Sequence, residues 1–293
     1  MAYPEYVCGS GSIGLQPMED SHAYISILRK HNIIDTALLY SNSEKRLGEL
    51  STPASFTIDT KSPSLARGTL TRASITAGLA ESLSRLQANQ VYTYYLHISD
   101  PSTPIDETVD AMQALHRQGQ GNSGAFARHL ETTLFPVLRG LRIAFSAYSA
   151  LAGGLVAKDP EKLEADAEGG RWTAQPDAPD AMLNDIYISM FHEPEFIEAL
   201  REWRVTAAEA GESPAMLSYR CWAVWNSKLD AGERDAVVIG ASRPSRLEQT
   251  LEGLARGLLK EETVGEIEGL WERVKAVAPV HSYHSYAKDM LCN

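Results

Sequence analysis

The chain has 293 residues, of which 44% are hydrophobic and 22% charged, a composition typical of a soluble globular protein. Its net charge of −11 argues against a nucleic-acid surface, which requires clustered Lys and Arg, and no apolar run approaches the roughly 20 residues that span a bilayer. The three distant cysteines and the absence of a secretory signal indicate a reducing, cytoplasmic location.

Strands and amphipathic helices alternate through the first part of the chain. Short runs of β-branched and aromatic residues predict strands at 7–8, 33–36, 56–60 and 91–96. Apolar residues at helical spacing predict the helices between them, one through Tyr24, Ile27 and Leu28, one over 75–86 and one over 105–115. This alternation predicts βαβ units and therefore a parallel sheet.

The pattern is less regular after residue 115. Composition predicts a loop at 118–124 and a long, charged surface loop at 157–180. Helices are expected at 130–138, 194–210, 214–225, after residue 240 through Leu247, Leu251 and Leu254, and at 261–276. Strands are expected at 141–147 and 237–240.

Polar residues follow three consecutive predicted strands. Asp35 ends one strand and Tyr40 follows it, Lys61 ends the next strand, and His97 ends the third. In a β/α barrel such positions meet at one mouth. A lysine ammonium beside a tyrosine favours the phenolate and lowers the tyrosine pKa, while a carboxylate holds the lysine and a histidine orients a carbonyl oxygen.

Each residue also has a simpler interpretation. Taken singly, Asp35 is a loop cap, Lys61 a solvated charge and His97 a loop histidine satisfied by its neighbours. Their joint placement at consecutive strand ends favours a catalytic set for carbonyl chemistry.

Several motifs resemble the aldo-keto reductase family, especially its aflatoxin-aldehyde reductase branch. The segment from Asp35 to Tyr40, with Ser43-Glu44 and Leu47-Gly48 after it, resembles the motif that joins that family's catalytic Asp and Tyr. Similar matches occur at 58–61, 95–100, 102–108, 130–136, 151–155, 238–242 and 247–249. The resemblance implies one domain over residues 1–293, an α/β fold of the (β/α)8 TIM barrel type, with Tyr40, Asp35, Lys61 and His97 as its catalytic residues.

The resemblance also implies an NADPH site. The Gly153-Gly154 turn would lie by the pyrophosphate, and the segment 242–250 would open a helix at the adenosine 2′-phosphate, where exposed N–H groups attract anions. Arg246 would read the 2′-phosphate, although it also fits a solvated helix charge, and Thr250 stands where the family often has Asn. The implied cofactor-binding residues are Ser149, Leu151, Gly153, Gly240, Ser242, Arg246, Gln249 and Thr250.

One stretch of the family pattern is missing. Between His116 and Arg128 the sequence passes almost directly to a later helix, so the barrel is expected to be incomplete, with the region of strands 5 and 6 missing. In the family this region supplies the Ser, Asn and Gln that hold the nicotinamide carboxamide and the Tyr that stacks on its ring. The C-terminal arginine that receives carboxylate substrates has no counterpart. His281 and His284 are a tail feature rather than a metal site, because no third ligand accompanies them.

These observations predict NADPH-dependent reduction of an aldehyde or ketone, with a small-molecule carbonyl substrate as partner and a homo-oligomer that covers the exposed strand edges. Two alternatives remain open at this point. One is a non-redox enzyme that isomerises or cyclises a carbonyl compound with the same side chains. The other is a binding protein without activity, against which the retained Asp35, Tyr40, Lys61 and His97 argue.

Overall fold

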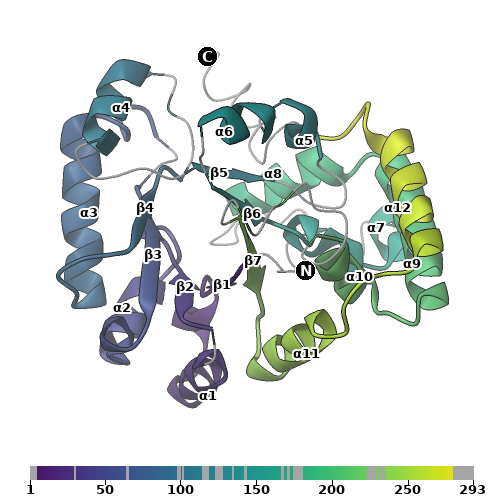
Figure 1. Cartoon of the computed structure of the whole chain (residues 1–293), viewed down its shortest axis with the longest axis horizontal. Coiled ribbons are helices and arrows are strands. Elements are labelled where there is room, and N and C mark those ends of the chain that lie inside the picture. The colour runs from purple at the N-terminus through teal and green to yellow at the C-terminus, as the bar shows by residue number, and fades with distance from the viewer. Residues whose placement is uncertain are drawn as a thin grey trace.

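The computed structural model contains one parallel β-sheet surrounded by helices (Figure 1). It describes residues 5–29, 31–63, 66–97, 100, 102–113, 119–122, 128–133, 135–141, 144–165, 168–169, 172–173, 181–222, 229, 232 and 235–279. Within these residues the sheet has seven strands in the order β4-β3-β2-β1-β7-β6-β5. The strands are β1 (Glu5–Gly9), β2 (Ile33–Asp35), β3 (Thr57–Lys61), β4 (Thr93–Tyr95), β5 (Gly119–Asn122), β6 (Phe145–Tyr148) and β7 (Ala236–Gly240).

Helices follow most strands, as a parallel sheet requires. In Figure 1, α3 and α4 lie on one side of the sheet and α9 and α12 on the opposite side. The α-helices are α1 (Met18–Leu28), α2 (Ser43–Glu49), α3 (Arg72–Leu86), α4 (Ile105–Gln113), α5 (Leu130–Thr133), α6 (Phe135–Leu141), α7 (Pro160–Glu164), α8 (Ala181–Phe191), α9 (Pro194–Glu209), α10 (Pro214–Arg220), α11 (Pro244–Leu254) and α12 (Glu261–Val274). Short 3-10 helices are η1 (Ile13–Leu15), η2 (Thr52–Ala54) and η3 (Ala152–Ala157).

The two faces of the sheet differ in chemistry. Register pairs Gly9 with Asp35, Asp35 with Asp59 and Asp59 with Thr93, and paired residues of a parallel sheet point to the same face. That inner face therefore carries polar side chains in β2, β3 and β4. The opposite face carries Cys8, Ile34, Ile58, Phe145 and Ile239, which are buried in the main hydrophobic core beneath the helices.

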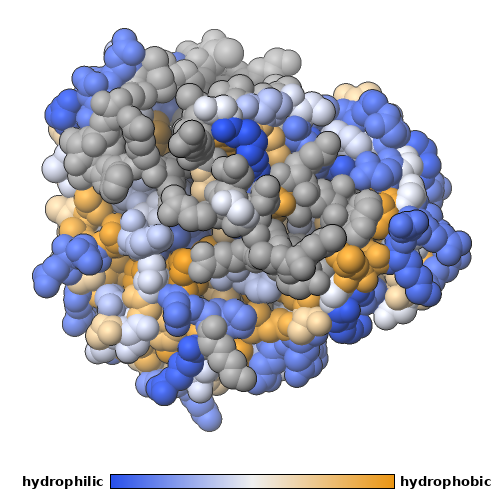
Figure 2. All heavy atoms as spheres, in the orientation of Figure 1, coloured by the Kyte–Doolittle hydropathy of each residue, from blue (hydrophilic) through white to orange (hydrophobic). Residues whose placement is uncertain are grey.

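A second hydrophobic core lies among the C-terminal helices. Phe196, Leu200 and Trp203 of α9 are fully buried and pack with Ile267 and Leu270 of α12. Figure 2 shows mainly hydrophilic residues on the outer surface at the right, where these two helices lie. In the described part of the chain, no helix combines the length and the apolarity that crossing a membrane requires.

The parallel sheet fits the expectation of an incomplete barrel in part, since its end strands among the described residues are β4 and β5, while the absence of the region of strands 5 and 6 stays a prediction. The loop predicted at 118–124 was wrong for 119–122, which form β5 and pair with β6. The segment Gly-Gln-Gly-Asn has no strand-like hydrophobic pattern, so there was no reason in the sequence to predict that its backbone pairs with another strand.

Three other expectations need correction. The strand expected at 141–147 begins only at Phe145, since Leu141 ends α6. The long surface loop at 157–180 contains α7, and Trp172 within it is buried. Helix α8 was not predicted, because its apolar residues do not fall on one face. The tail histidines His281 and His284 lie outside the described residues.

Candidate active site

The side chains of Lys61 and Asp35 form a buried ion pair on the inner face of the sheet. Lys61 Nζ lies 2.6 Å from Asp35 Oδ1, and the two side chains are only 6% and 5% exposed. The ammonium also donates to the carbonyl oxygen of Thr36 at 2.7 Å. The two contacts fix the ammonium in place at the carboxyl ends of β2 and β3, as the sequence predicted for residues at strand ends.

Tyr40 lies directly against this pair. Lys61 Nζ is 4.8 Å from the centre of the Tyr40 ring, a cation–π distance. Contrary to the expectation that Lys61 lowers the pKa of Tyr40, that pKa is raised well above its usual value, chiefly by desolvation and then by the charge of Asp35 and by Tyr187. The ammonium faces the ring while its bonds go to Asp35 and Thr36, so desolvation dominates.

His97 completes the group. Its ring meets the edge of the Tyr40 ring, with 5.4 Å between centroids and an 85° angle between planes. Burial and then the charge of Lys61 lower the pKa of His97 to about 3, so its protonated form is disfavoured. His97 is therefore a neutral imidazole at pH 7, with one ring N–H to donate.

A network of small hydroxyls fixes the loops under this site. Ser10 Oγ donates to the Asp35 carbonyl at 2.9 Å, Ser43 Oγ donates to the Ser10 carbonyl at 3.0 Å, and the Ser43 and Thr36 hydroxyls lie 2.9 Å apart. All three side chains are buried. They tie the segments after β1 and β2 to the start of α2, which limits the positions that Tyr40 can take.

A single cavity of about 1360 Å³ connects the predicted residues. Asp35, Tyr40, Lys61 and His97 line one part of it. The predicted cofactor residues line it as well, namely Ser149, Leu151, Gly153, Gly240, Ser242, Arg246, Gln249 and Thr250. The structure therefore brings both predicted sets around the same space, although they come from distant parts of the chain.

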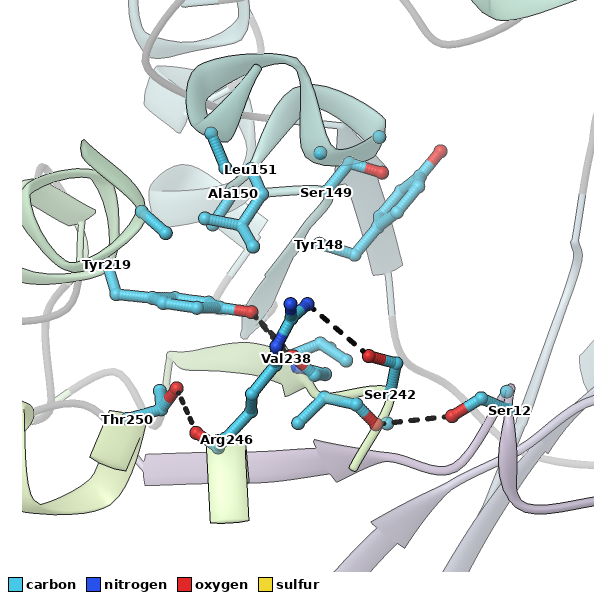
Figure 3. A pocket seen from close by; sticks show the side chains of 18 of the residues that line it. Ser12, Tyr148, Ser149, Ala150, Leu151, Tyr219, Val238, Ser242, Arg246 and Thr250 are labelled. Carbon is cyan, nitrogen blue, oxygen red and sulfur yellow. Dashed lines mark hydrogen bonds between the residues drawn. The ribbon is translucent and has the colours of Figure 1, made fainter. Parts of the chain in front are cut away.

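Near α11 the cavity is lined by Ser242, Arg246 and Thr250, among others (Figure 3). Arg246 is exposed and its Nη1 is 3.5 Å from Ser242 Oγ, while Thr250 Oγ1 donates to the Arg246 carbonyl at 2.9 Å. At the end of β7, Tyr219 Oη donates to the Gly240 carbonyl at 2.9 Å. These contacts leave the Arg246 guanidinium directed into the cavity and without a carboxylate partner in the described part of the chain.

Sequence reasoning missed an aromatic wall beside Tyr40. Trp172 and Tyr187 both line the cavity, with 6.0 Å between their ring centres. Gly153 has φ of +67°, and a Cβ there would lie 2.3 Å from Cε1 of Tyr187, so only glycine allows this close approach. The Gly153-Gly154 pair was found as a motif, but nothing in the sequence indicated which ring packs against it.

No group of three or more His, Cys, Asp or Glu residues that could hold a metal ion occurs in the described ranges. The two cysteines in these ranges, Cys8 and Cys221, are buried and form no disulfide within the described part of the chain.

The side chains at the strand ends of this parallel β/α sheet are Lys61, Asp35, Tyr40 and His97. This arrangement defines a class of barrel proteins that act on carbonyl groups. The family model for the aldo/keto reductase family matches residues 28–126 and 120–272. The chain belongs to the aldo/keto reductase family, a family of oxidoreductases, and this confirms the resemblance seen in its motifs.

Individual relatives agree with this assignment. The oxidoreductase sirO of Leptosphaeria maculans is 32% identical, over 90% of this chain and 89% of that protein. Aflatoxin B1 aldehyde reductase member 4 of Homo sapiens is 30% identical, over 92% of this chain and 94% of that protein. The solved glycerol dehydrogenase of Gluconobacter oxydans has a TM-score of 0.65 at 19% identity, covering 92% of this chain and 91% of that one, and supports the fold alone.

Proposed function

We propose that this protein reduces an aldehyde or ketone to an alcohol with NADPH as the reductant. The observation that carries the proposal is the single cavity, which joins Tyr40, Lys61 and His97 at one end to Ser242 and Arg246 at the other. A relative named as an oxidoreductase and others named as aldehyde reductases favour this function over a non-redox reaction or binding alone.

The side chains of the chain would handle the carbonyl oxygen. The neutral His97 imidazole donates a hydrogen bond to that oxygen and orients it. Tyr40 supplies the proton, because its phenol remains protonated at neutral pH. Lys61, held by Asp35 at 2.6 Å, places a positive charge against the Tyr40 ring and stabilises the phenolate that remains. NADPH, when bound, supplies the hydride that the reduction consumes.

The residues present fit the adenosine end of NADPH. The exposed Arg246 guanidinium and the Ser242 hydroxyl offer donors for a phosphate at the first turn of α11. The turn at Gly153 and Gly154 has positive φ at both residues and offers close backbone approach for a pyrophosphate.

The nicotinamide end is proposed to differ from that of the family. The motif pattern lacks the segment that supplies its carboxamide ligands and stacking tyrosine, between His116 and Arg128. The family model matches in two stretches that meet at 120–126, inside this region, which supports a real deletion. The aromatic side chains of Tyr148 and Tyr187 line the cavity and are available to flank the ring instead.

Two further features accompany the proposal. The chain is proposed to act on small carbonyl compounds in the cytoplasm, without nucleic-acid or membrane partners. It is also proposed to form a homo-oligomer, since β4 and β5 end the described sheet and an exposed strand edge is usually covered. Light scattering at micromolar concentration should report a mass above that of one chain, and a strict monomer would refute the oligomer.

Titration of NADPH, followed by cofactor fluorescence, tests the central proposal. We expect saturable binding, followed by NADPH consumption when aldehydes and ketones are added. A folded protein that neither binds NADPH nor consumes it with any carbonyl substrate would overturn the proposal.

A further inference from the structure

The inner face of the sheet carries a second buried carboxyl group, Asp59, in addition to Asp35. Asp59 belongs to β3, two residues before Lys61, so both side chains point to the inner face. It is 3% exposed. Interiors of β/α barrels are normally filled by bulky aliphatic residues, which makes an aspartate at this depth exceptional.

The contacts of Asp59 connect it to Lys61. Tyr95, the cross-strand partner of Lys61, donates from its hydroxyl to Asp59 Oδ2 at 3.2 Å. The Lys61 ammonium lies 6.0 Å from the centre of the same Tyr95 ring. The other oxygen, Asp59 Oδ1, is buried and has no hydrogen-bond partner in the described part of the chain. An unpartnered buried carboxylate oxygen is costly, and a proton on it removes most of that cost.

We infer that Asp59, a second carboxyl group near Lys61, is a positioning residue that tunes the acidity of Tyr40 by changing its own charge. With Asp59 protonated, Asp35 alone balances the Lys61 ammonium and the buried group is neutral. With Asp59 ionised, the same group carries a net negative charge, which disfavours a phenolate at Tyr40 and makes it a weaker acid.

The surroundings allow this change of charge near neutral pH. Burial raises the pKa of Asp59 to about 7, opposed by the hydroxyls of Thr93 and Tyr95 and by Lys61 and reinforced by Asp35. The titratable groups that act on Asp59 are Asp35 from β2, Lys61 from β3 and Tyr95 from β4. The neighbouring inward positions of β1, β6 and β7 hold no charge, being Val7, Ser146 and Val238. His97 and Tyr40 do not titrate near neutrality, because the pKa of His97 is lowered to about 3 and that of Tyr40 is raised well above its usual value.

The inference rests on the proposed reductase activity, and its first test is the pH profile of turnover. In the wild type, carbonyl reduction should fall as the pH rises through neutrality. Asp59→Asn keeps the shape without the charge, so the fall should disappear and turnover near pH ~8.5 should exceed that of the wild type by roughly fivefold. Tyr95→Phe removes a hydrogen bond that favours the ionised carboxylate, so it should move the fall to higher pH.

Glu44 of α2, which contacts Thr60 on the opposite face of β3, offers a matched control. It is 1% exposed and accepts a hydrogen bond from Thr60 Oγ1 at 2.6 Å, and burial raises its pKa. Glu44→Gln removes a buried carboxyl group close to β3 without changing the charge beside Lys61, so the pH profile should keep its fall. A profile that changes equally in Glu44→Gln and Asp59→Asn would overturn the inference.

A second measurement separates failure of the inference from failure of the proposed function. Infrared spectra should contain the carbonyl stretch of a protonated carboxyl group that titrates near neutrality, persists in Glu44→Gln and disappears in Asp59→Asn. If the wild type has no turnover, the ionisation of Tyr40 is followed by ultraviolet absorbance against Tyr40→Phe. Asp59→Asn should then lower the pH of that ionisation by about one unit. An unshifted ionisation of Tyr40, or an infrared signal that never titrates, would overturn the role of Asp59 whatever the activity.

Discussion

The two ends of the cavity are built in opposite ways. Around Lys61 the polar side chains are buried, and the ammonium is bonded to Asp35 and Thr36. Around Arg246, the side chains are exposed and are joined by a long 3.5 Å contact to Ser242. The buried end holds a proton donor in a fixed position before any ligand arrives. The open end suits a large, charged ligand that brings its own hydrogen-bond acceptors. Proton handling and ligand capture therefore place different demands on the same sheet.

The largest expected effect is at the buried end. Tyr40→Phe keeps the ring that packs between Lys61 and His97 but removes the proton, so the fold and NADPH binding should survive. Turnover should fall by roughly 10²–10⁴-fold, the usual contribution of a general acid. Steady-state rates and fluorescence titration check both parts, and full activity on the true substrate would remove Tyr40 from the mechanism.

Lys61→Met tests how far the buried end depends on its ion pair. The substitution leaves Asp35, whose side chain is 5% exposed, as a buried charge without its cation. The free energy of unfolding should drop by about 3–5 kcal/mol, measured with urea. Adding Asp35→Asn should recover part of that loss, since the unpaired charge is then gone. Strictly additive losses in the double variant would show that the pair is not coupled.

Because of Asp59, the free energy of unfolding of the protein should fall as the pH rises. Its pKa is about 7 in the folded chain against an ordinary value of 3.8, so the folded state binds the proton more tightly than the unfolded state between these values. Stability falls as the pH rises through this window and stays low above it. Relative to the wild type, Asp59→Asn should therefore gain up to a few kcal/mol above neutrality and nothing near pH ~4. A variant that is less stable than the wild type at every pH contradicts this.

The smallest effect is expected at the open end. Arg246→Ala should weaken NADPH binding by about tenfold to a hundredfold and leave NADH binding nearly unchanged, because only NADPH carries the 2′-phosphate. Arg243→Ala is the matched control, since Arg243 is exposed at the same helix start but does not line the cavity. Equal weakening of both nucleotides would show that Arg246 does not read the 2′-phosphate.

The sequence predicted some residues of the cavity and missed others. Asp35, Lys61 and His97 stand at strand ends, and strand ends are readable from short apolar runs, so their meeting could be expected. Trp172 and Tyr187 come from segments with loop-like or unpatterned composition, and only tertiary packing carries them to Tyr40. The sign of the Tyr40 pKa shift was predicted wrongly, because a sequence shows that a lysine is near but not how much water is lost.

Strand β5 shows that backbone pairing, too, can be hard to predict from a sequence. Its residues Gly119–Asn122 have almost no propensity for a strand, and in the described part of the chain they pair with Phe145–Tyr148. The gap that we predicted in the family pattern, with strands 5 and 6 missing, stays a prediction.

The pairing of β1 with β7 has a consequence for the order in which the molecule forms. Residues Glu5 to Gly9 hydrogen-bond with Ala236 to Gly240, so the first strand waits for one of the last elements to be synthesised. The proton-handling residues lie within the first hundred positions and their strands can associate early, whereas closing the cavity requires a contact between distant ends of the chain. Such non-local contacts form slowly. During most of its synthesis, the nascent chain therefore already contains the proton-handling residues, while the cavity that encloses them has not yet formed.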